Sequence, residues 1–273
     1  MAERRILVRR HAVVTRVTHW LNALVLLVLL MSGLQIFNAH PALYWGDAST
    51  FADPWIAMRK EEVAGEARGV TQLGDLRLDT TGLLGWSGRE GAREQRGFPA
   101  WATIPSYRSL ADGRRWHFFF AWLFVANGAL YVAWSLVRGH LARDLLPTLS
   151  QLRLRNLAHE VVTHARLRFP KGEEARRYNA IQKLAYLAVI LLMLPTMVLT
   201  GLCMSPGFNA TAPWLVELFG GRQSARSIHF LTAGLIVAFV IVHLVMVVLS
   251  GPWNNLRSMI TGRYAIEVEG ERP

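Results

Sequence analysis

Cysteine is nearly absent from this sequence, in which Cys203 is the only one. A single thiol cannot form an internal disulfide, attach a haem covalently through a CxxCH motif or supply the ligands of an iron–sulfur cluster. Acidic residues are also few: 19 Asp and Glu stand against 30 Lys and Arg, for a formal net charge of +11. No basic patch interleaved with aromatic residues accompanies this excess, so the charge does not indicate a nucleic-acid surface.

Charged residues are missing altogether from four long apolar segments. Each segment has about 20 residues, the length that a helix needs to cross a hydrocarbon core roughly 30 Å thick. Because lipid offers no hydrogen bonds to the backbone, such segments are predicted to be helices. The predicted spans are residues 18–37, 116–137, 184–204 and 228–250.

These spans predict the fold class. We expect an all-α membrane protein, a four-transmembrane-helix bundle in which residues 1–273 form a single domain, with a long loop at 38–115 and a second loop at 138–183. Four buried helices of a soluble protein would need more polar sequence to cover them than the chain has. The first span follows a basic stretch, as a signal peptide does, but its apolar run is too long and no small-residue cleavage site ends it. We expect it to be retained.

The basic residues are distributed unevenly between the loops. Five arginines and only Glu3 lie before the first span, and loop 138–183 has ten basic against four acidic residues, whereas loop 38–115 balances ten with ten. Cytoplasmic loops of membrane proteins carry the excess of Lys and Arg. We therefore expect a multi-pass protein of the bacterial cytoplasmic membrane, with both termini and loop 138–183 in the cytoplasm. The Arg-rich segment 152–167 predicts an amphipathic helix on the inner leaflet.

Four of the nine histidines lie within the spans: His19, His117, His229 and His243. Ionisable groups are costly inside a bilayer and mark functional sites there. With a cytoplasmic N-terminus, His117 and His229 lie at the outer ends of their spans and His19 at an inner end. Fourteen residues of helix place His243 roughly 21 Å deeper than His229, at the level of His19. Two levels with two imidazoles each match the axial ligands of two six-coordinate haem irons.

Each of three spans also begins with an RxxH motif, so that Arg16, Arg114 and Arg226 precede a histidine by three residues. Residues three apart share one helix face, and Arg binds carboxylates such as haem propionates well. Arginines that merely anchor a span at the interface would explain their place near the span ends, but not the repeated spacing to histidine. Small residues within the spans could also let a flat macrocycle approach the helix backbone; they are Gly33, Gly128, Gly201 and Gly234.

The sequence resembles the di-haem cytochrome b subunits of formate dehydrogenase, nickel–iron hydrogenase and thiosulfate reductase. The resemblance covers all four spans and rests on the three RxxH motifs, on His243 after His229, and on Tyr178-Asn-Ala-Ile-Gln-Lys183. It implies a membrane-anchoring subunit that binds two haem b groups, with His19 paired to His243 and His117 paired to His229. The long first loop and segment 37–46 are most similar to the thiosulfate-reductase type.

The resemblance further implies a quinone site beside the inner haem, formed by Asn179 and His243. The chain has Ile181 where some relatives have glycine, which changes the bulk near that pocket. The implied partners are membrane lipid, quinone as an exchangeable substrate, and a molybdopterin oxidoreductase on the outer face. Electrons would pass between that partner and the quinone pool.

Two other functions remain open from the sequence. A stand-alone cytochrome b would oxidise a small molecule such as superoxide, with quinone as the acceptor. A transporter would use the histidines to bind metal ions or relay protons, and it predicts histidines that converge on one path rather than on two levels. His40, in Asn38-Ala-His-Pro41, is interpreted as a turn residue before proline, with contact to a partner or to the outer haem as the alternative.

Overall fold

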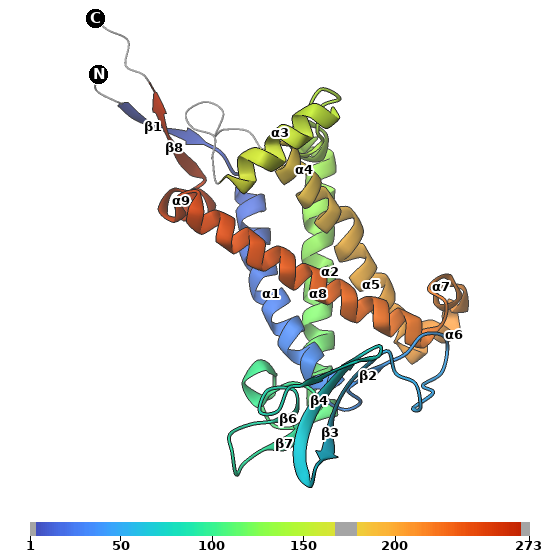
Figure 1. Ribbon diagram of the computed structural model, residues 1–273. Helices are drawn as coiled ribbons and strands as arrows, with labels where there is room; N and C mark the ends of the chain where they lie inside the picture. The colour runs from blue at the N-terminus through green and yellow to red at the C-terminus, as the bar shows by residue number, and fades with distance from the viewer. Residues whose placement is uncertain (1–3, 167–178, 269–273) are drawn as a thin grey trace, which may run out of the picture. The chain divides into compact units, whose positions relative to one another are not determined.

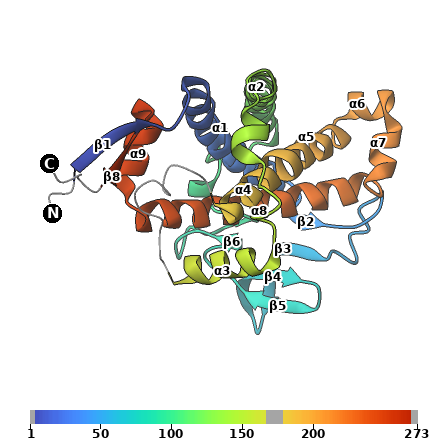
Figure 2. The same ribbon diagram turned by 90° about the horizontal axis from the view of Figure 1, so that it is seen from above.

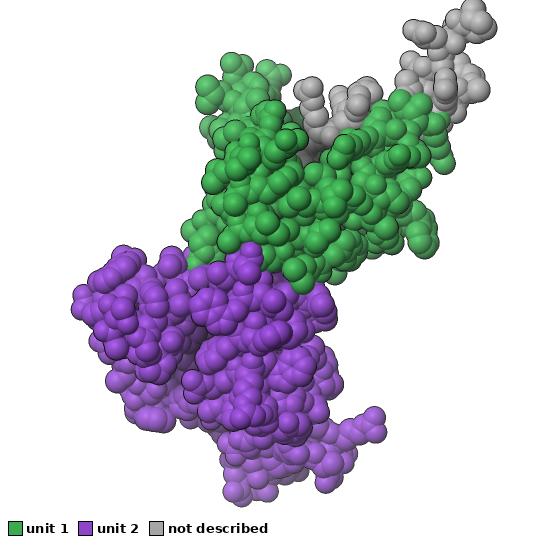
Figure 3. All heavy atoms as spheres, turned by 180° about the vertical axis from the view of Figure 1, so that it is seen from behind, with its two compact units in different colours: residues 1–21, 127–195, 234–273 green, residues 22–126, 196–233 purple. Residues whose placement is uncertain are grey.

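A computed structural model describes residues 4–166 and 179–268 of the chain (Figure 1). Two predicted features extend beyond them, namely the end of the amphipathic segment 152–167 and Tyr178 of the motif that precedes the third span. The chain divides into two compact units (Figure 3), and each is described by itself. Unit 1 comprises residues 1–21, 127–195 and 234–273, and unit 2 comprises residues 22–126 and 196–233.

Four helical segments in the described residues are long and apolar enough to cross a membrane: Val13–Phe37, Leu110–Val137, Ala180–Cys203 and Arg222–Leu249. The first, second and fourth are the helices α1, α2 and α8. They confirm the prediction of a mostly helical protein with four membrane-length helices. Each begins four to six residues before the apolar run that predicted it, because the polar residues there complete the first helical turns.

The start of α2 shows how a polar first turn forms. The Ser109 hydroxyl lies 3.2 Å from the Asp112 backbone nitrogen and 2.8 Å from the Asp112 carboxylate. The N-cap serine oxygen thus accepts from one of the amide groups that the start of a helix leaves free, and its hydroxyl donates to the carboxylate three positions later. Helix α2 therefore begins at Leu110 rather than at the first apolar residue, Trp116.

The third span is not one regular helix. It consists of α4 (Ala180–Leu187), a π-helical stretch (Ala188–Met193) and α5 (Leu194–Cys203). Pro195 has no backbone N–H and its ring clashes with the preceding turn of a regular α-helix. The wider π-helical turn directly before it is one of the ways in which a helix accommodates such an interruption.

Unit 1 also contains a ribbon made from the two ends of the chain (Figure 2). Strands β1 (Arg4–Arg9) and β8 (Arg263–Val268) pair antiparallel, and α9 (Pro252–Thr261) leads into β8. Gly262 makes this junction with a φ of 80°, and a Cβ on it would lie 2.9 Å from the His11 carbonyl oxygen. Helix α3 (Leu154–Ala165) confirms the amphipathic helix expected in loop 138–183, and a π-helical turn at Leu141–Leu145 precedes it.

Loop 38–115 of unit 2 holds strands that the sequence patterns did not predict. An antiparallel sheet has the order β2-β3-β4-β5, and a second sheet pairs β6 with β7. The Ala64-Gly65 turn between β3 and β4 has φ angles of 54° and 82°, as a two-residue hairpin turn requires. The strands are β2 (Ala42–Leu43), β3 (Ile56–Val63), β4 (Glu66–Leu73), β5 (Leu76–Asp79), β6 (Gly85–Ser87) and β7 (Glu94–Arg96). Short helices complete the unit: Ala100–Ala102, α6 (Pro206–Thr211) and α7 (Pro213–Leu218).

A buried arginine joins this loop to the end of α1. The Arg96 side chain is only 4% exposed, and burial lowers its pKa below the ordinary arginine value. Its guanidinium donates to the carbonyls of Phe98 and Ser106, to the Gln35 side chain and to the Thr103 hydroxyl. Four acceptors around one cation satisfy polar groups that would otherwise be buried without partners.

Arg96→Leu is expected to destabilise loop 38–115 by about 3 kcal/mol, because it leaves several buried acceptors without a hydrogen-bond donor. Limited proteolysis of the purified chain should then cut within the loop at least tenfold faster than in the unmodified protein, a factor that needs only about 1.4 kcal/mol. Arg89→Leu removes the same charge from an exposed side chain and serves as the control. Equal cleavage rates for both variants would contradict the role given to Arg96.

Candidate functional site

Unit 2 brings together two of the predicted histidines, one from α2 and one from α8. The imidazole centroids of His117 and His229 lie 6.3 Å apart, with an angle of 61° between the ring planes. An iron atom bonded at about 2 Å to a nitrogen of each ring, with about 1.1 Å from nitrogen to ring centre, would separate two centroids by about 6.2 Å. The spacing of this unit 2 pair is therefore within about 0.1 Å of that expected for two imidazoles that bind one metal ion.

Each imidazole of the unit 2 pair has a hydroxyl beside its Nδ1 atom. Ser32 of α1 lies 3.0 Å from His117 Nδ1, and Thr200 of α5 lies 3.0 Å from His229 Nδ1. The same hydroxyls donate to helix carbonyls four residues earlier, Ser32 to Val28 at 2.7 Å and Thr200 to Thr196 at 2.6 Å. A hydroxyl has only one proton to donate, so each of these oxygens accepts from the imidazole.

This arrangement fixes the tautomer of both rings. Nδ1 carries the proton that is donated to the hydroxyl, and Nε2 keeps its lone pair. A neutral imidazole with one nitrogen donating to a neighbour and the other free is the form in which histidine binds a metal ion. Both rings are thus prepared as ligands before any metal is considered.

Glycine follows each of the two hydroxyl residues and allows the helices to approach the rings. A Cβ atom on Gly33 would lie 3.4 Å from His117 Cε1, and one on Gly201 would lie 3.6 Å from His229 Cε1. A larger side chain at either position would fill the space beside an imidazole. The short sequences Ser32-Gly33 and Thr200-Gly201 therefore each place a hydroxyl beside an imidazole Nδ1 and a glycine beside the same ring, on two different helices.

Unit 1 brings together the other two histidines, from α1 and α8. The His19 and His243 centroids lie 6.4 Å apart with an angle of 59° between the planes, almost the same geometry as in unit 2. His243 stacks on Phe239 at 5.9 Å, and His19 packs edge-on against Trp20 at 5.3 Å. The space beside Gly128 and Gly234 is open, since a Cβ on either would meet no atom within 4 Å.

The surroundings of the unit 1 pair differ from those in unit 2. The buried Nδ1 atom of His19 has no hydrogen-bond partner among the residues that the structure describes. Nearby, the buried Asn127 side chain of α2 donates to the Thr18 carbonyl at 2.9 Å, which ties the backbone next to His19 to α2. The two pairs therefore share their spacing but not their hydrogen bonding.

The three RxxH arginines make different contacts. Arg16 donates to the Ile260 carbonyl, and Arg226 donates to the carbonyls of His40 and Ala42 at 2.6 and 2.9 Å. Arg114 is exposed and its guanidinium lies 5.3 Å from the centroid of the Phe118 ring. A guanidinium has five N–H donors, so these contacts leave donors on Arg16 and Arg226 for a carboxylate, and the propionate role of all three stays a prediction.

Asn179 and His40, the remaining residues singled out from the sequence, have local partners. Asn179 is the N-cap of α4, and its side-chain oxygen accepts from the Gln182 backbone N–H at 2.9 Å. His40 stacks on Tyr44 and lies 3.2 Å from the tyrosine hydroxyl. Burial and, to a smaller extent, Arg226 lower the pKa of His40. These contacts give both residues a structural role, and the quinone role of Asn179 stays a prediction.

The donor set is the one that haem b requires. In the described residues no group of three or more His, Cys, Asp and Glu side chains is arranged to hold a metal ion, and the histidines occur instead as two separate pairs. A tetrahedral metal site needs about four such ligands, whereas haem leaves only two axial positions for the protein to fill. Two imidazoles at iron-ligand spacing in each unit therefore fit a haem.

Comparison with known proteins agrees with this geometry. The profile of the prokaryotic cytochrome b561 family matches residues 10–262. The chain belongs to this family. It is also similar to a protein of Azospira oryzae described as a putative protein-methionine-sulfoxide reductase subunit YedZ1, with 29% identity over 247 residues that cover 90% of this chain and 93% of that protein. No solved structure gives a significant match.

Membership of the prokaryotic cytochrome b561 family confirms the resemblance that the RxxH motifs indicated. The protein is a multi-pass membrane protein that transfers electrons and binds haem b. Sequence reasoning missed Ser32, Thr200 and Asn127, which hold the histidines or the backbone next to them. The signal for the first two was a hydroxyl residue directly before a glycine inside an apolar span.

Proposed function

We propose that this cytochrome b561-family protein is a di-haem membrane subunit that passes electrons between an oxidoreductase on the outer face and quinone near the inner face. The observation that carries the proposal is the occurrence of two imidazole pairs with centroids 6.3 and 6.4 Å apart, one in each unit. One pair would serve a single haem. Two pairs would serve two haems, one at each of the two levels that the sequence predicts.

The histidines hold and tune the two haem b groups in this proposal. His117 and His229 would bind one through Nε2, and His19 and His243 would bind the other. Haem b with two imidazole ligands supplies a one-electron carrier whose potential depends on ligand basicity, hydrogen bonding and burial. Ser32 and Thr200 act on the unit 2 pair alone, because accepting a hydrogen bond from Nδ1 increases the basicity of the imidazole.

The double replacement Ser32→Ala with Thr200→Val tests this tuning. A less basic imidazole favours the ferric state less, so the midpoint potential of the haem held by the unit 2 pair should rise. A tenfold change in the ferric-to-ferrous equilibrium corresponds to about 59 mV for one electron. We expect a rise of about that size for one centre in a redox titration of the purified protein.

The matched control for this prediction is Thr163→Val, which removes a hydroxyl that also donates to a helix carbonyl, that of His159, but faces no predicted ligand. Its potentials should equal those of the unmodified protein. Unchanged potentials in the double variant, with haem content intact, would show that the hydroxyls do not tune the ligands.

The direction of insertion follows from the charge distribution. Both termini and loop 138–183 carry the excess of Lys and Arg, so we place them in the cytoplasm of a bacterium and loop 38–115 on the outer side. The site for quinone, formed by Asn179 and His243, then lies near the inner face. A reporter fused after Pro273 should be active only if it works in the cytoplasm; activity of an exported reporter at that position would contradict this orientation.

The partner in this proposal is a molybdopterin oxidoreductase that docks on loop 38–115. Support comes from the Azospira oryzae relative, which is described as a putative subunit of a reductase. We expect the chain, purified through an affinity tag from mildly solubilised native membranes, to carry a second protein with molybdenum in a one-to-one ratio. Purification of a haem protein that contains no molybdenum, yet reduces quinone with superoxide as donor, would support the stand-alone cytochrome instead.

A further inference from the structure

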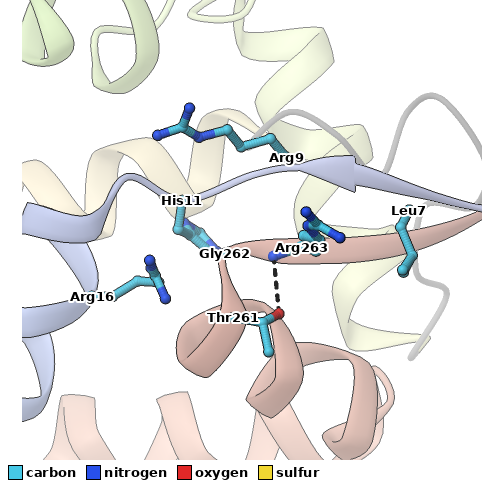
Figure 4. Close-up of a pocket in the computed structure, with 7 residues that line it drawn as sticks. All are labelled: Leu7, Arg9, His11, Arg16, Thr261, Gly262 and Arg263. Atoms are coloured by element: carbon cyan, nitrogen blue, oxygen red, sulfur yellow. Dashed lines mark hydrogen bonds between the residues drawn. The ribbon is translucent and has the colours of Figure 1, made fainter.

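Three arginines from three elements of unit 1 line one cavity (Figure 4). It has a volume of about 440 Å³ and lies where β1, the start of α1 and the end of α9 meet. Arg9 comes from β1, Arg16 from α1 and Arg263 from β8; the other lining residues are Leu7, His11, Thr261 and Gly262. No Asp or Glu is among the lining residues, so the cavity concentrates positive charge without an internal counter-ion.

The strand register places two of these charges opposite each other. Arg9 and Arg263 lie directly opposite each other in the antiparallel pair. Like charges in directly opposite positions destabilise a strand pair. Within the described part of the chain, neither side chain has an ion pair or hydrogen bond that would offset the repulsion. An anion bound between the two guanidinium groups would remove it.

Arg16 contributes a further possible hydrogen-bond donor to an anion in the cavity. Its Nη1 donates to the Ile260 carbonyl, whereas its buried Nε has no hydrogen-bond partner among the described residues. Burial lowers the pKa of His11 to about 4, with Arg10 the next cause, so His11 is uncharged near neutral pH. The positive charge of the lining therefore comes from arginines, whose planar forks bind phosphate oxygens in pairs.

Helix α9, which ends at this cavity, presents an apolar face to its surroundings. Trp253, Leu256 and Ile260 are 83%, 39% and 58% exposed. Spacings of three and four residues place them on one face of the helix. The polar face packs inward instead, since the Asn254 side chain both donates to and accepts from the Ala265 backbone at 2.9 Å. A helix with its apolar face outward and its polar face on the protein is suited to the membrane interface.

A further contact places the same helix end beside the start of a membrane-length helix. The half-exposed Trp20 of α1 donates its indole N–H to the Met259 carbonyl at 3.1 Å. Tryptophan is enriched at the boundary between hydrocarbon and headgroups. These contacts favour a position of the cavity at the depth of the lipid phosphates, next to apolar side chains that could contact the acyl chains.

From these observations we infer that the Arg9–Arg16–Arg263 cavity binds the phosphate of an anionic phospholipid, whose acyl chains lie against Trp253, Leu256 and Ile260 of α9. The bound lipid joins the ends of the chain, β1 and β8, to the start of α1. The inference does not depend on the identity of a partner protein, and it assigns Arg16 to the lipid phosphate rather than to a haem propionate.

Native mass spectrometry of the full-length chain tests the inference. The protein is exchanged into micelles that contain equal amounts of phosphatidylglycerol and phosphatidylcholine, and the retained lipids are counted. The unmodified protein should retain phosphatidylglycerol preferentially. Arg9→Gln with Arg263→Gln should lower the ratio of the two retained lipids about tenfold, because two guanidinium–phosphate contacts are lost. Arg153→Gln with Arg155→Gln, both exposed in unit 1 and neither lining the cavity, removes equal charge and should leave the ratio unchanged.

Other outcomes would overturn the inference. An unchanged lipid ratio in the Arg9/Arg263 variant, or an equal fall in the control, would show that the cavity has no special part in lipid binding. Displacement of the retained lipid by millimolar inorganic phosphate would indicate a site for free anions. Loss of haem b with the lipid ratio unchanged would assign the arginines to a haem propionate. Should the double variant fail to fold, Arg263→Gln alone provides the same comparison with a smaller expected fall.

Discussion

His229→Ala should leave the purified protein with one haem b where the unmodified protein has two. The replacement removes one ligand of the unit 2 pair and leaves the unit 1 pair, which lies in a separate compact unit with its own packing contacts. His117→Ala should give the same result, because it removes the other ligand of the same pair. The haem-to-protein ratio from the pyridine haemochrome spectrum measures the loss.

The reciprocal replacement provides the complementary observation. His243→Ala should also leave one haem, but the remaining centre should be the one whose potential responds to Ser32→Ala and Thr200→Val. His159→Ala, which removes an exposed histidine of α3, should leave both haems in place. Equal loss of both haems from each single ligand variant, in protein that is still folded, would contradict two independent pairs.

Asn179→Leu should slow the reaction with quinone by at least tenfold while haem content stays constant. The replacement removes a side chain assigned to the quinone site, but it also removes the N-cap of α4, which costs about 1 kcal/mol of helix stability. These two effects need to be separated. Asn179→Asp keeps an oxygen that accepts from the Gln182 N–H and removes only the amide NH₂ donor.

The two variants of Asn179 then give a clear comparison. If the amide donor contacts quinone, the haem of both variants should be reduced slowly after mixing with a soluble quinol, as followed by the b-type absorption bands. If the aspartate variant reacts at the rate of the unmodified protein and only the leucine variant is slow, Asn179 acts through the start of α4 and the quinone assignment is wrong. His159→Ala is again a suitable control for both.

The helices and the histidine pairs could be predicted because each depends on a local pattern. The length of a membrane-crossing helix can be read directly from an apolar run of about 20 residues. The fixed rise per residue then places His243 relative to His229 along one helix. The pairing of these histidines with His117 and His19 needed only the alternation of helix direction from span to span. The observed centroid distances agree with that pairing.

The features that could not be predicted depend on contacts distant in sequence. Strands β1 and β8 pair residues from opposite ends of the chain, and no local pattern in Arg4–Arg9 indicates its partner. The β2–β5 sheet has charged residues on much of its length, so its strands lack the clear alternation that marks a half-buried strand. Ser32 and Thr200 look like ordinary polar residues of a membrane helix until the imidazoles beside them are known.

The most direct test of the whole account is a potentiometric titration of the purified full-length chain, combined with its haem-to-protein ratio. We predict two haem b per chain and a titration that requires two one-electron centres, with the centre sensitive to Ser32 and Thr200 at the lower potential because its ligands are the more basic. A ratio of one haem per chain, with a titration that a single centre describes, would contradict the two-pair arrangement on which the proposed electron transfer rests.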